Sequence, residues 1–363
     1  MLNTPLNDEH LKLGASFTDF GGWNMPVRYG SDLDEHHAVR NQCGLFDISH
    51  MAEIRVQGSD AARFLDFATI SKLSELENGR AKYTLIVNHQ GKAIDDLIVY
   101  RIGEDEFLVV ANASNRHAVV VALLERAEGF ADLEVLDESD GWALLALQGP
   151  KAAEVLEGLC AKELSSAKYY SILGASIQGV EVLLARTGYT GEDGFEIFVP
   201  EQDAVEIWQL LVSQSEVTPC GLACRDTLRL EAGMPLYGHE LNLETTPFEA
   251  NLGKVIRFDK GGFVGREALE ELSGQTPETK LYGLKGEGRR AARAEYEIYL
   301  PQGVDPIGQV SSGALSPTLG YPIAMAFLDG NLKLEVGSKL EADVRGTRVP
   351  YEVVELPFYK RKR

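Results

Sequence analysis

Two adjacent carboxylates, Asp95 and Asp96, stand near the start of an otherwise apolar segment, residues 93–100. This segment has the pattern of a β-strand, in which neighbouring side chains point to opposite faces. We therefore expect at least one of the two acids to face a covered side of a sheet. An enclosed carboxylate can handle protons near neutral pH or hold an amine through a charge-assisted hydrogen bond. The alternative, which composition alone favours, is a solvated pair of acids that flanks a hairpin.

A second segment, residues 186–196, carries three glycines at spacings of three, with Tyr189 between them and Glu196 at its end. Glycines let a backbone approach a ligand closely, while Tyr189 and Glu196 offer a flat apolar face and an acid. A plain turn-rich connection explains the same pattern equally well. A third segment places Arg225 beside Asp226 at the start of a predicted helix, which is typical of a structural ion pair.

Metal and nucleotide sites have little support in the sequence. His36 and His37 are adjacent in a predicted helix, where their side chains point about 100° apart, and His50 is isolated. Cys220 and Cys224 have no second cysteine pair or nearby histidine that could complete a zinc site. No dinucleotide-binding glycine motif, P-loop, H-E-x-x-H motif or G-x-S-x-G elbow is present. We therefore predict neither a metal nor a nucleotide cofactor.

The elements that must position these groups alternate between strands and helices. The sequence predicts strands at 52–57, 83–87, 94–101, 107–111, 142–148, 180–187 and 194–199. It predicts helices whose N-terminal caps are Ser31 and Ser59, and further helices at 115–128, after Gly149-Pro150, at 202–213 and at 222–232. Hairpin turns join several of the strands, so the sheets are expected to be mostly antiparallel and the fold class α+β. Residues 270–280 form the best linker candidate, and beyond them short strands predict a small β-barrel. We therefore expect two parts: residues 1–270, with two interleaved α+β domains, and residues 280–363.

Length and composition narrow the function. The 363 residues are 44% hydrophobic and 25% charged, which excludes general disorder. The formal net charge is −20, from 35 basic and 55 acidic residues, and such a surface repels nucleic acids and anionic membranes. No apolar stretch approaches the ~20 residues needed to cross a bilayer, and the N-terminus lacks the features of a leader peptide. Four cysteines fit a reducing compartment, so a cytoplasmic location is expected.

Several segments carry a family resemblance that runs nearly from end to end. They are DFGGWNMPVRYGS, CGLFDISHM, AIDDLIVYR, ALQGP, RTGYTGEDGFEIF, GLACRDTLRLEAGMPLYGHEL, TPFEANLG, KGGFVGREAL and SSGALSPTLGYPIAMA, in this order. The chain resembles the aminomethyltransferase, or T-protein, family of the glycine cleavage system. The resemblance implies a cloverleaf of three domains around a folate channel, with a C-terminal β-barrel. It also implies an enzyme that takes the aminomethyl group from the lipoyl arm of the H-protein, releases ammonia and forms 5,10-methylenetetrahydrofolate.

The resemblance also implies roles for individual residues. Asp96 matches the second acid of the family's D-D-L motif, the proposed catalytic carboxylate, and Glu196 and Arg225 match residues assigned to folate recognition. Further positions of the folate pocket correspond to Met51, Tyr83, Asn112, Tyr169 and Tyr189, and a C-terminal aromatic contact to Tyr359 or Phe358. Expected partners are the lipoylated H-protein and, functionally, the P- and L-proteins, in a bacterium, with no nucleic acid or membrane partner.

Two positions depart from the family pattern. Lys92 stands where a second glycine commonly precedes the I-D-D strand, and Glu295 stands at the glycine of an R-x-G-Y turn in the barrel. Neither change touches the acids named above, but the second concerns the local geometry of the barrel.

Other classes share this fold. A folate-binding iron–sulfur assembly factor carries K-G-C-Y-x-G-Q-E, whereas this chain has Gly262 at the cysteine position. Sarcosine- and dimethylglycine-oxidising enzymes carry a flavin domain on the same chain, for which this chain has neither the length nor the fingerprint. A separate flavoprotein partner and transferases that act on other methylated substrates stay open as alternatives.

Overall fold

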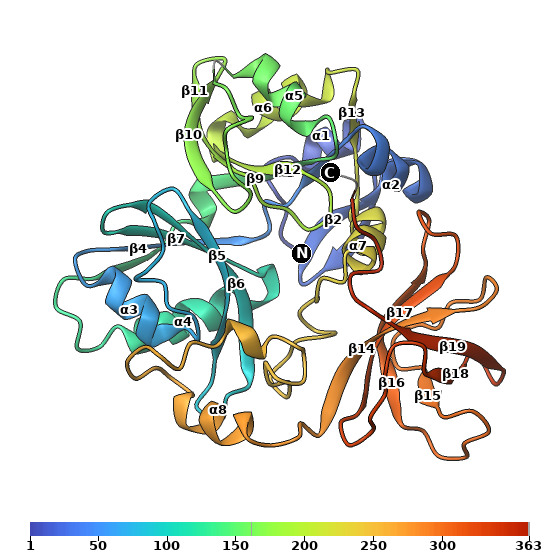
Figure 1. The fold of residues 1–363 in the computed structure, drawn as a ribbon. Coiled ribbons are helices and arrows are strands. Elements are labelled where there is room, and N and C mark those ends of the chain that lie inside the picture. The colour runs from blue at the N-terminus through green and yellow to red at the C-terminus, as the bar shows by residue number, and fades with distance from the viewer. Residues whose placement is uncertain (161, 362–363) are drawn as a thin grey trace. The chain divides into compact units, whose positions relative to one another are not determined.

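The structure is a computed structural model that describes residues 1–160 and 162–361. It forms two compact units, drawn in Figure 1. Unit 1 comprises Met1–Ile86, Asp95–Arg225 and Lys260–Phe263, and unit 2 comprises Val87–Ile94, Asp226–Asp259 and Val264–Arg363. Residues 362 and 363, at the end of the predicted barrel domain, lie outside the described residues.

Unit 1 contains a five-stranded sheet that is built largely from hairpins. Its strand order is β5-β6-β7-β4-β8. The strands are β4 (Ala52–Gln57), β5 (Ala81–Val87), β6 (Ala93–Gly103), β7 (Glu106–Ala111) and β8 (Glu134–Asp137), and the helices α3 (Ala61–Ala68) and α4 (Arg116–Arg126) pack against them (Figure 1). The predicted antiparallel strands are confirmed, with Ile98 paired to Val110 between β6 and β7. This sheet positions Asp95 and Asp96.

A six-stranded sheet forms the other half of unit 1, in the order β10-β11-β12-β9-β3-β13. Its strands are β3 (Cys43–Asp47), β9 (Trp142–Gln148), β10 (Ile172–Ile177), β11 (Val180–Ala185), β12 (Gly194–Pro200) and β13 (Val217–Pro219). Helices α2 (Asp32–Asn41), α5 (Ala152–Leu159) and α6 (Ala204–Val212) pack on it. Trp208 of α6 lies in its buried core with Leu145 and Phe195. This sheet positions Glu196.

Short elements complete unit 1 and the segments that join it to unit 2. They are α1 (Asn7–Lys12), the hairpin β1 (Ser16–Phe20) and β2 (Trp23–Arg28), α7 (Leu222–Glu231), and the 3₁₀ turns η1 (Ala113–Asn115), η2 (Ser139–Gly141), η3 (Glu201–Asp203) and η4 (Gly253–Val255). The predicted cap of α2 is confirmed, since the Ser31 hydroxyl accepts a hydrogen bond from the Asp34 N–H at 3.2 Å. The predicted Ser59 cap of α3 is wrong: the N-cap is Asp60, and the Ser59 hydroxyl instead donates to Asp132 at 2.6 Å.

Unit 2 contains a closed barrel, as predicted. Its strand order is β14-β17-β16-β15-β18-β19, and pairing of Leu284 with Val353 closes it. The strands are β14 (Thr279–Gly286), β15 (Glu297–Tyr299), β16 (Gly308–Leu315), β17 (Pro322–Asp329), β18 (Lys339–Asp343) and β19 (Arg348–Val354). Among the described residues beyond 280 there is no helix. The expected α+β class with a C-terminal barrel is therefore confirmed.

The predicted linker is shorter than expected. Helix α8 (Arg266–Ser273) includes the first four residues of the predicted segment, and β14 begins at Thr279. Alanine, leucine and glutamate favour the helix, Leu269 is fully buried, and Arg266 pairs with Glu270 at 2.6 Å. The turn residues that follow Ser273 masked this helical signal in the sequence. Only residues 274–278 connect α8 to the barrel.

The barrel turn in which the family pattern has a glycine forms here with Glu295 at that position. Glu295 adopts a φ of 70°, in the left-handed region that favours glycine. Its N–H donates to the Val310 carbonyl at 2.8 Å, and the Tyr296 N–H donates to Arg293 at 3.1 Å. The turn is therefore kept at the cost of local backbone strain, and the barrel closes.

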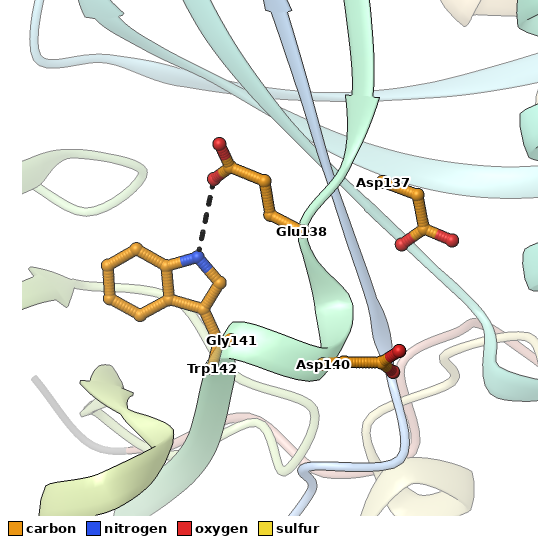
Figure 2. Close-up of a pocket in the computed structure, with 5 residues that line it drawn as sticks. All are labelled: Asp137, Glu138, Asp140, Gly141 and Trp142. Atoms are coloured by element: carbon orange, nitrogen blue, oxygen red, sulfur yellow. Dashed lines mark hydrogen bonds between the residues drawn. The ribbon is translucent and has the colours of Figure 1, made fainter.

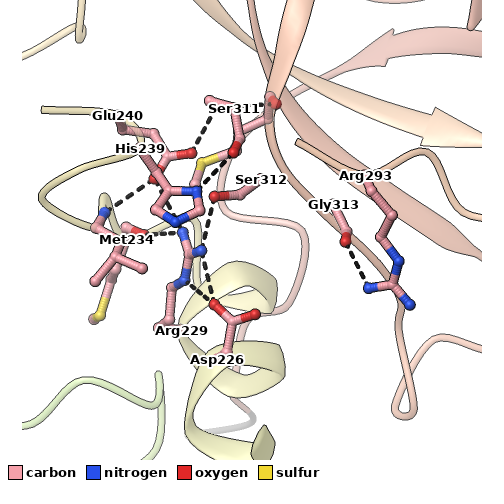
Figure 3. Close-up of polar contacts among 11 residues, drawn as sticks. Asp226, Arg229, Met234, His239, Glu240, Arg293, Ser311, Ser312 and Gly313 are labelled. Carbon is pink, nitrogen blue, oxygen red and sulfur yellow. Dashed lines mark hydrogen bonds and ion pairs between the residues drawn. The ribbon is translucent and has the colours of Figure 1, made fainter. Parts of the chain in front are cut away.

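A charged cluster with Arg229 and Glu240 buried at its centre, which we call the Arg229 cluster, fixes part of unit 2 (Figure 3). It consists of Asp226, Arg229, Glu240, Ser311 and Ser312. The Arg229 guanidinium donates to Asp226 at 2.9 Å, to Glu240 at 3.1 Å and to the Ser312 hydroxyl at 2.7 Å. Ser311 donates to the other oxygen of Glu240 at 2.5 Å. The ion pair predicted between Arg225 and Asp226 is therefore wrong, because Asp226 pairs with Arg229.

Candidate active site

Asp95 and Asp96 both face enclosed surroundings, so the solvated alternative is wrong. Asp95 is fully buried and Asp96 partly so. The two carboxylates are not separated by the strand as alternation suggests, because the Asn112 side-chain amide donates to both of them at 2.8 Å. The Asn112 N–H and Asn115 also donate to Asp95, at 2.9 and 2.6 Å, and the Tyr83 hydroxyl donates to Asp96 at 2.9 Å. Asn112, just beyond β7, thus draws the two acids together.

This enclosure changes the charge of the pair. Burial raises the pKa of Asp96, and burial together with repulsion from Asp96 raises the pKa of Asp95 to about 8. The donated hydrogen bonds oppose the shift but do not cancel it. Asp95 is therefore the member of the pair that keeps a proton at neutral pH. Burial and mutual repulsion thus disfavour two negative charges on this pair, and the Tyr83 hydroxyl and the Asn112 amide donate to Asp96.

Glu196 lies at a junction between the two sheets of unit 1. It sits on the interior strand β12, paired with Ala146 and Ala185, and is 8% exposed. Its Oε2 accepts hydrogen bonds from Thr187 at 2.5 Å and from the Tyr100 hydroxyl at 3.1 Å. Tyr100 lies on β6 with Asp96, so these bonds join the acid of one sheet to the strand that carries the other acid.

The glycine-rich loop folds around a protein side chain. A Cβ atom on Gly188 would lie 2.0 Å from Gln148 Oε1, and one on Gly194 would lie 2.5 Å from the Leu147 carbonyl. The Gln148 amide donates to the Thr187 carbonyl at 3.0 Å and accepts from Thr190 at 2.9 Å. These two glycines therefore permit close packing of the loop on β9.

Unit 1 also contains a cationic and aromatic group of residues, formed by Arg225, Tyr189 and His50. The Arg225 guanidinium carbon lies 4.9 Å from the centre of the Tyr189 ring, a cation–π contact. Arg225 Nη1 is buried and has no hydrogen-bond partner among the described residues, and His50 Nδ1 shares both properties. Burial, with the Arg225 charge as a second cause, lowers the pKa of His50 to about 4. His50 is therefore neutral at pH 7, and Arg225 retains a donor that the described chain does not use.

The other predicted site residues take different places. Met51 is half-buried in a turn, where its N–H donates to the Ile48 carbonyl at 3.0 Å. Tyr169 is 41% exposed and contacts the edge of the Tyr170 ring, with the ring centres 5.0 Å apart. Tyr359 belongs to unit 2, where its N–H donates to the Glu231 carbonyl at 2.8 Å. The contacts given above thus group Tyr83, Asn112 and Asp96, and separately Tyr189 and Arg225.

Sequence reasoning missed several groups of this site. Tyr100 and Thr187 bind Glu196, and Asn115 binds Asp95. Burial raises the pKa of Tyr170, and the charges of Glu196 and Asp96 add to this shift. Tyr100 follows Asp96 at an even spacing on one strand, which places both on the same face and could have indicated it. Thr187 lies inside the glycine-rich segment, residues 186–196, that the sequence already indicates as a candidate for ligand contact. Nothing in the local sequence distinguishes Tyr170 from the exposed Tyr169.

A separate pocket of about 370 Å³ in unit 1 contains none of these residues (Figure 2). Its lining acids are paired: Asp137 and Asp140 each bind Arg116 at 2.7 Å, and Glu138 accepts from Arg55 at 2.7 Å and from the Trp142 indole at 3.5 Å. These acids therefore serve local ion pairs.

The described residues contain no group of three or more histidine, cysteine, aspartate or glutamate side chains that could hold a metal ion. No helix within 1–160 or 162–361 is long and apolar enough to cross a membrane. All four cysteines are buried and free.

Family models and curated relatives match this chain over nearly its whole length. The model of the GCVT N-terminal domain matches residues 6–260, and that of the glycine cleavage T-protein C-terminal barrel domain matches residues 280–360. An aminomethyltransferase of Streptomyces avermitilis is 52% identical, and one of Halothermothrix orenii 42%; each alignment covers 99% of this chain and 98% or 100% of the relative.

The structural comparison agrees. The crystal structure of the glycine cleavage system aminomethyltransferase T from Bartonella henselae superposes with a TM-score of 0.93 at 36% identity, over 99% of this chain and 98% of that one. The predicted family and fold are confirmed. The chain belongs to the glycine cleavage T-protein family and has that family's tetrahydrofolate-dependent aminomethyltransferase activity.

Proposed function

We propose that Asp96, Glu196, Arg225, Tyr83 and Tyr189 form the catalytic and folate-binding site of this aminomethyltransferase. The observation that supports it most is the set of polar groups in unit 1 that the protein leaves without partners. Arg225 Nη1 is buried without an acceptor, and the two hydrogen bonds to Glu196 described above both reach Oε2. Buried polar groups normally have partners, so unused ones favour a ligand. Asn112 and Met51 belong to this proposed site, and Tyr169 is a less central member. The ligand contact of Tyr359, which lies in unit 2, stays a prediction from the family resemblance.

Glu196 and Arg225 serve in binding. Tetrahydrofolate, when bound, supplies the nitrogen nucleophiles that accept the methylene group. A reduced pterin presents adjacent N–H donors, and the Glu196 carboxylate is acceptor-only, so the two match as a forked hydrogen-bonded pair. Thr187 and Tyr100 hold that carboxylate in place. Arg225 offers donors to an oxygen of the ligand, while the Tyr189 ring fixes its guanidinium plane.

Asp96 serves in the reaction itself. With Asp95 protonated, the pair carries its negative charge on Asp96, which Tyr83 and Asn112 orient. A carboxylate so placed binds an amine by a charge-assisted hydrogen bond and stabilises positive charge that develops on it. Its action is electrostatic, with no covalent bond to the protein. The Asn112 amide acts as a positioning group because it fixes both carboxylates.

The partners follow from the family. Glycine cleavage T-proteins act with the H-protein of that system, and the proposed donor here is its lipoyl arm in aminomethylated form. Functional association with the P- and L-proteins, a cytoplasmic location and a bacterial source belong to the same proposal, without a nucleic acid or membrane partner. The proposed division assigns folate binding to residues 1–270 and the barrel to residues 280–363.

The experiment uses the purified chain with tetrahydrofolate and aminomethylated H-protein. Ammonia and 5,10-methylenetetrahydrofolate should form in equal amounts, and omission of either substrate should abolish both products. Tetrahydrofolate at ~100 times its Kd should also stabilise the protein by about 2.7 kcal/mol in a thermal melt. Absence of both turnover and a thermal shift would contradict the proposed site.

A further inference from the structure

Glu53, on β4, is a buried acid without hydrogen-bond partners. Its exposed fraction is 1%, and neither carboxylate oxygen has a partner among the described residues. Its main chain is fixed: the N–H donates to the Ser139 hydroxyl, and the carbonyl accepts from the Glu138 N–H, both at 2.9 Å. Arg55, two residues along the same face, is by contrast paired with Glu106 and Glu138.

The strand register places Glu53 on the working face of the five-stranded sheet. Directly paired residues of antiparallel strands project to the same side. Glu53 pairs with Val110 of β7, and Val110 pairs with Ile98 of β6. Ile98 stands between Asp96 and Tyr100, at the even spacing that keeps all three on one face. Glu53 thus shares a face with the proposed catalytic acid, two strands away, or roughly 10 Å.

Burial makes the ionised form of Glu53 unfavourable. Burial raises the pKa of Glu53 well above its usual value, and the charges of Asp137 and Glu196 raise it further, against an opposing effect of Arg116. Burial therefore favours the neutral carboxylic acid form of Glu53, which has one O–H donor and one carbonyl acceptor. The influence of Glu196 also shows that the two side chains lie within electrostatic reach of each other.

We propose that Glu53 is a further ligand-binding residue, which pairs with a donor–acceptor edge of the bound reduced pterin. This inference rests on the proposed function. The edge with two donors, the 2-amino group and N3–H, matches an acceptor-only carboxylate. A neutral acid instead matches the flanking edges, N1 with N8–H or O4 with N5–H, because each offers one acceptor and one donor. Glu53 thus adds a second buried acid, suited to a different edge from the one proposed for Glu196.

Two variants of Glu53 test this pairing. Glu53→Leu removes both polar atoms, so the Kd for tetrahydrofolate, measured by calorimetry, should rise about 10- to 100-fold. The melting temperature of the ligand-free protein should rise as well, because an unpaired buried group is removed. Glu53→Gln retains a donor and an acceptor without charge, so it should recover most of the lost affinity. Gln57→Leu, on the same strand and face, is the matched control and should leave the Kd unchanged.

The outcomes separate this inference from the proposed function. Failure of the wild type to bind tetrahydrofolate refutes the proposed function. Wild-type binding with an unchanged Kd in Glu53→Leu refutes only the role of Glu53. A lower melting temperature of ligand-free Glu53→Leu, with Glu53→Gln binding as weakly as the leucine variant, also overturns the inference, since Glu53 would then support the fold.

Pterin analogues identify the edge. Tetrahydrofolate with carbon in place of N8 lacks one donor, and the analogue with carbon in place of N5 lacks the other. The analogue that loses the contact should bind wild type more weakly yet bind Glu53→Leu no worse than tetrahydrofolate does. If both analogues lose the same factor in wild type and in the variant, Glu53 touches neither edge and the inference fails.

Discussion

Two regions of this protein, the Arg229 cluster and the surroundings of the proposed site in unit 1, bury charged groups in opposite ways. In the Arg229 cluster of unit 2, Arg229 and Glu240 are 2% and 0% exposed, and each makes several hydrogen bonds (Figure 3). In unit 1, Glu53 has no partner for either oxygen, and Arg225 and His50 each keep a buried nitrogen unpaired. Burial raises or lowers the pKa of several groups there, Asp95, Glu53 and His50 among them.

This difference separates a structural role from a functional one. A buried charge with all its partners contributes a defined local geometry, and its loss is felt as a loss of stability. Buried groups without partners destabilise the free protein. They are retained where a ligand supplies the missing partners, and perturbed pKa values cluster at such places. On this basis the Arg229 cluster is expected to matter for folding, and the groups of unit 1 for binding and turnover.

The largest expected effect is on the folding of unit 2. Arg229→Met removes the cation from Glu240 and leaves a buried carboxylate unpaired, so the free energy of unfolding should fall by about 3–5 kcal/mol. Urea denaturation of the ligand-free chain measures this change. Lys339→Met is the control, since Lys339 is exposed and forms a surface ion pair with Glu352 at 2.7 Å; it should change the unfolding curve little. A stable Arg229→Met protein would show that the cluster does not act as a structural unit.

The next effect concerns turnover. Asp96→Asn keeps the size of the side chain but removes its negative charge, so kcat should fall by about 10²-fold or more while the folate Kd changes little. Asp95→Asn should cost much less, about tenfold at most, because Asp95 is already neutral at pH 7. Steady-state kinetics with aminomethylated H-protein, with folate titration of both variants, makes the comparison. An inactive Asp95→Asn beside an active Asp96→Asn would reverse the assignment within the pair.

A smaller effect is expected on binding. Glu196→Gln replaces one acceptor oxygen by a donor that faces the donors of the pterin, which should weaken folate affinity by roughly 1–3 kcal/mol. The rate at saturating folate should change less than the Kd. Glu192→Gln offers a matched control, because Glu192 is a buried acid of the same loop that binds Arg40 at 2.9 Å; it should affect stability rather than folate affinity. An unchanged Kd in Glu196→Gln would mean that Glu196 only fixes the loop to Tyr100.

The fold was largely predictable because its signals are local. Strand alternation and turn residues identified β4, β6, β7, β9 and β12, and the Ser31 cap marked the start of α2. The errors arose where two local signals compete. The turn residues after Ser273 obscured the last turn of α8, and the adjacency of Arg225 and Asp226 suggested an ion pair that the fold instead gives to Arg229.

The site was less predictable because its geometry is not local. Strand alternation suggests that Asp95 and Asp96 diverge, yet Asn112, sixteen residues beyond Asp96, binds both carboxylates. Tyr100 reaches Glu196 across 96 positions of sequence. Glu53 looks like an ordinary solvent-facing acid in an alternating strand, and its burial depends on packing that no local pattern encodes. Contacts of this kind depend on how the two sheets of unit 1 meet.

The smallest expected effect, the pH dependence that Asp95 gives to stability, tests the charge state on which this comparison depends. The folded chain holds a proton on Asp95 up to a pKa of about 8, whereas the usual value is 3.8. Between these values the folded state binds more protons than the unfolded state, so this contribution to stability is largest at low pH and is lost as the pH rises through 8. From pH 7 to pH 8 the loss of this contribution should lower the free energy of unfolding by about 1 kcal/mol.

The test compares wild type with Asp95→Asn. The asparagine does not titrate, so the unfolding free energy of this variant should lack the loss. The pKa of His50, lowered to about 4 from 6.5, acts with the opposite sign and only below pH 7. Urea denaturation of both proteins at pH 7 and pH 8 gives the difference, and an equal loss in both would mean that Asp95 is already ionised at pH 7 and that the pair carries two charges.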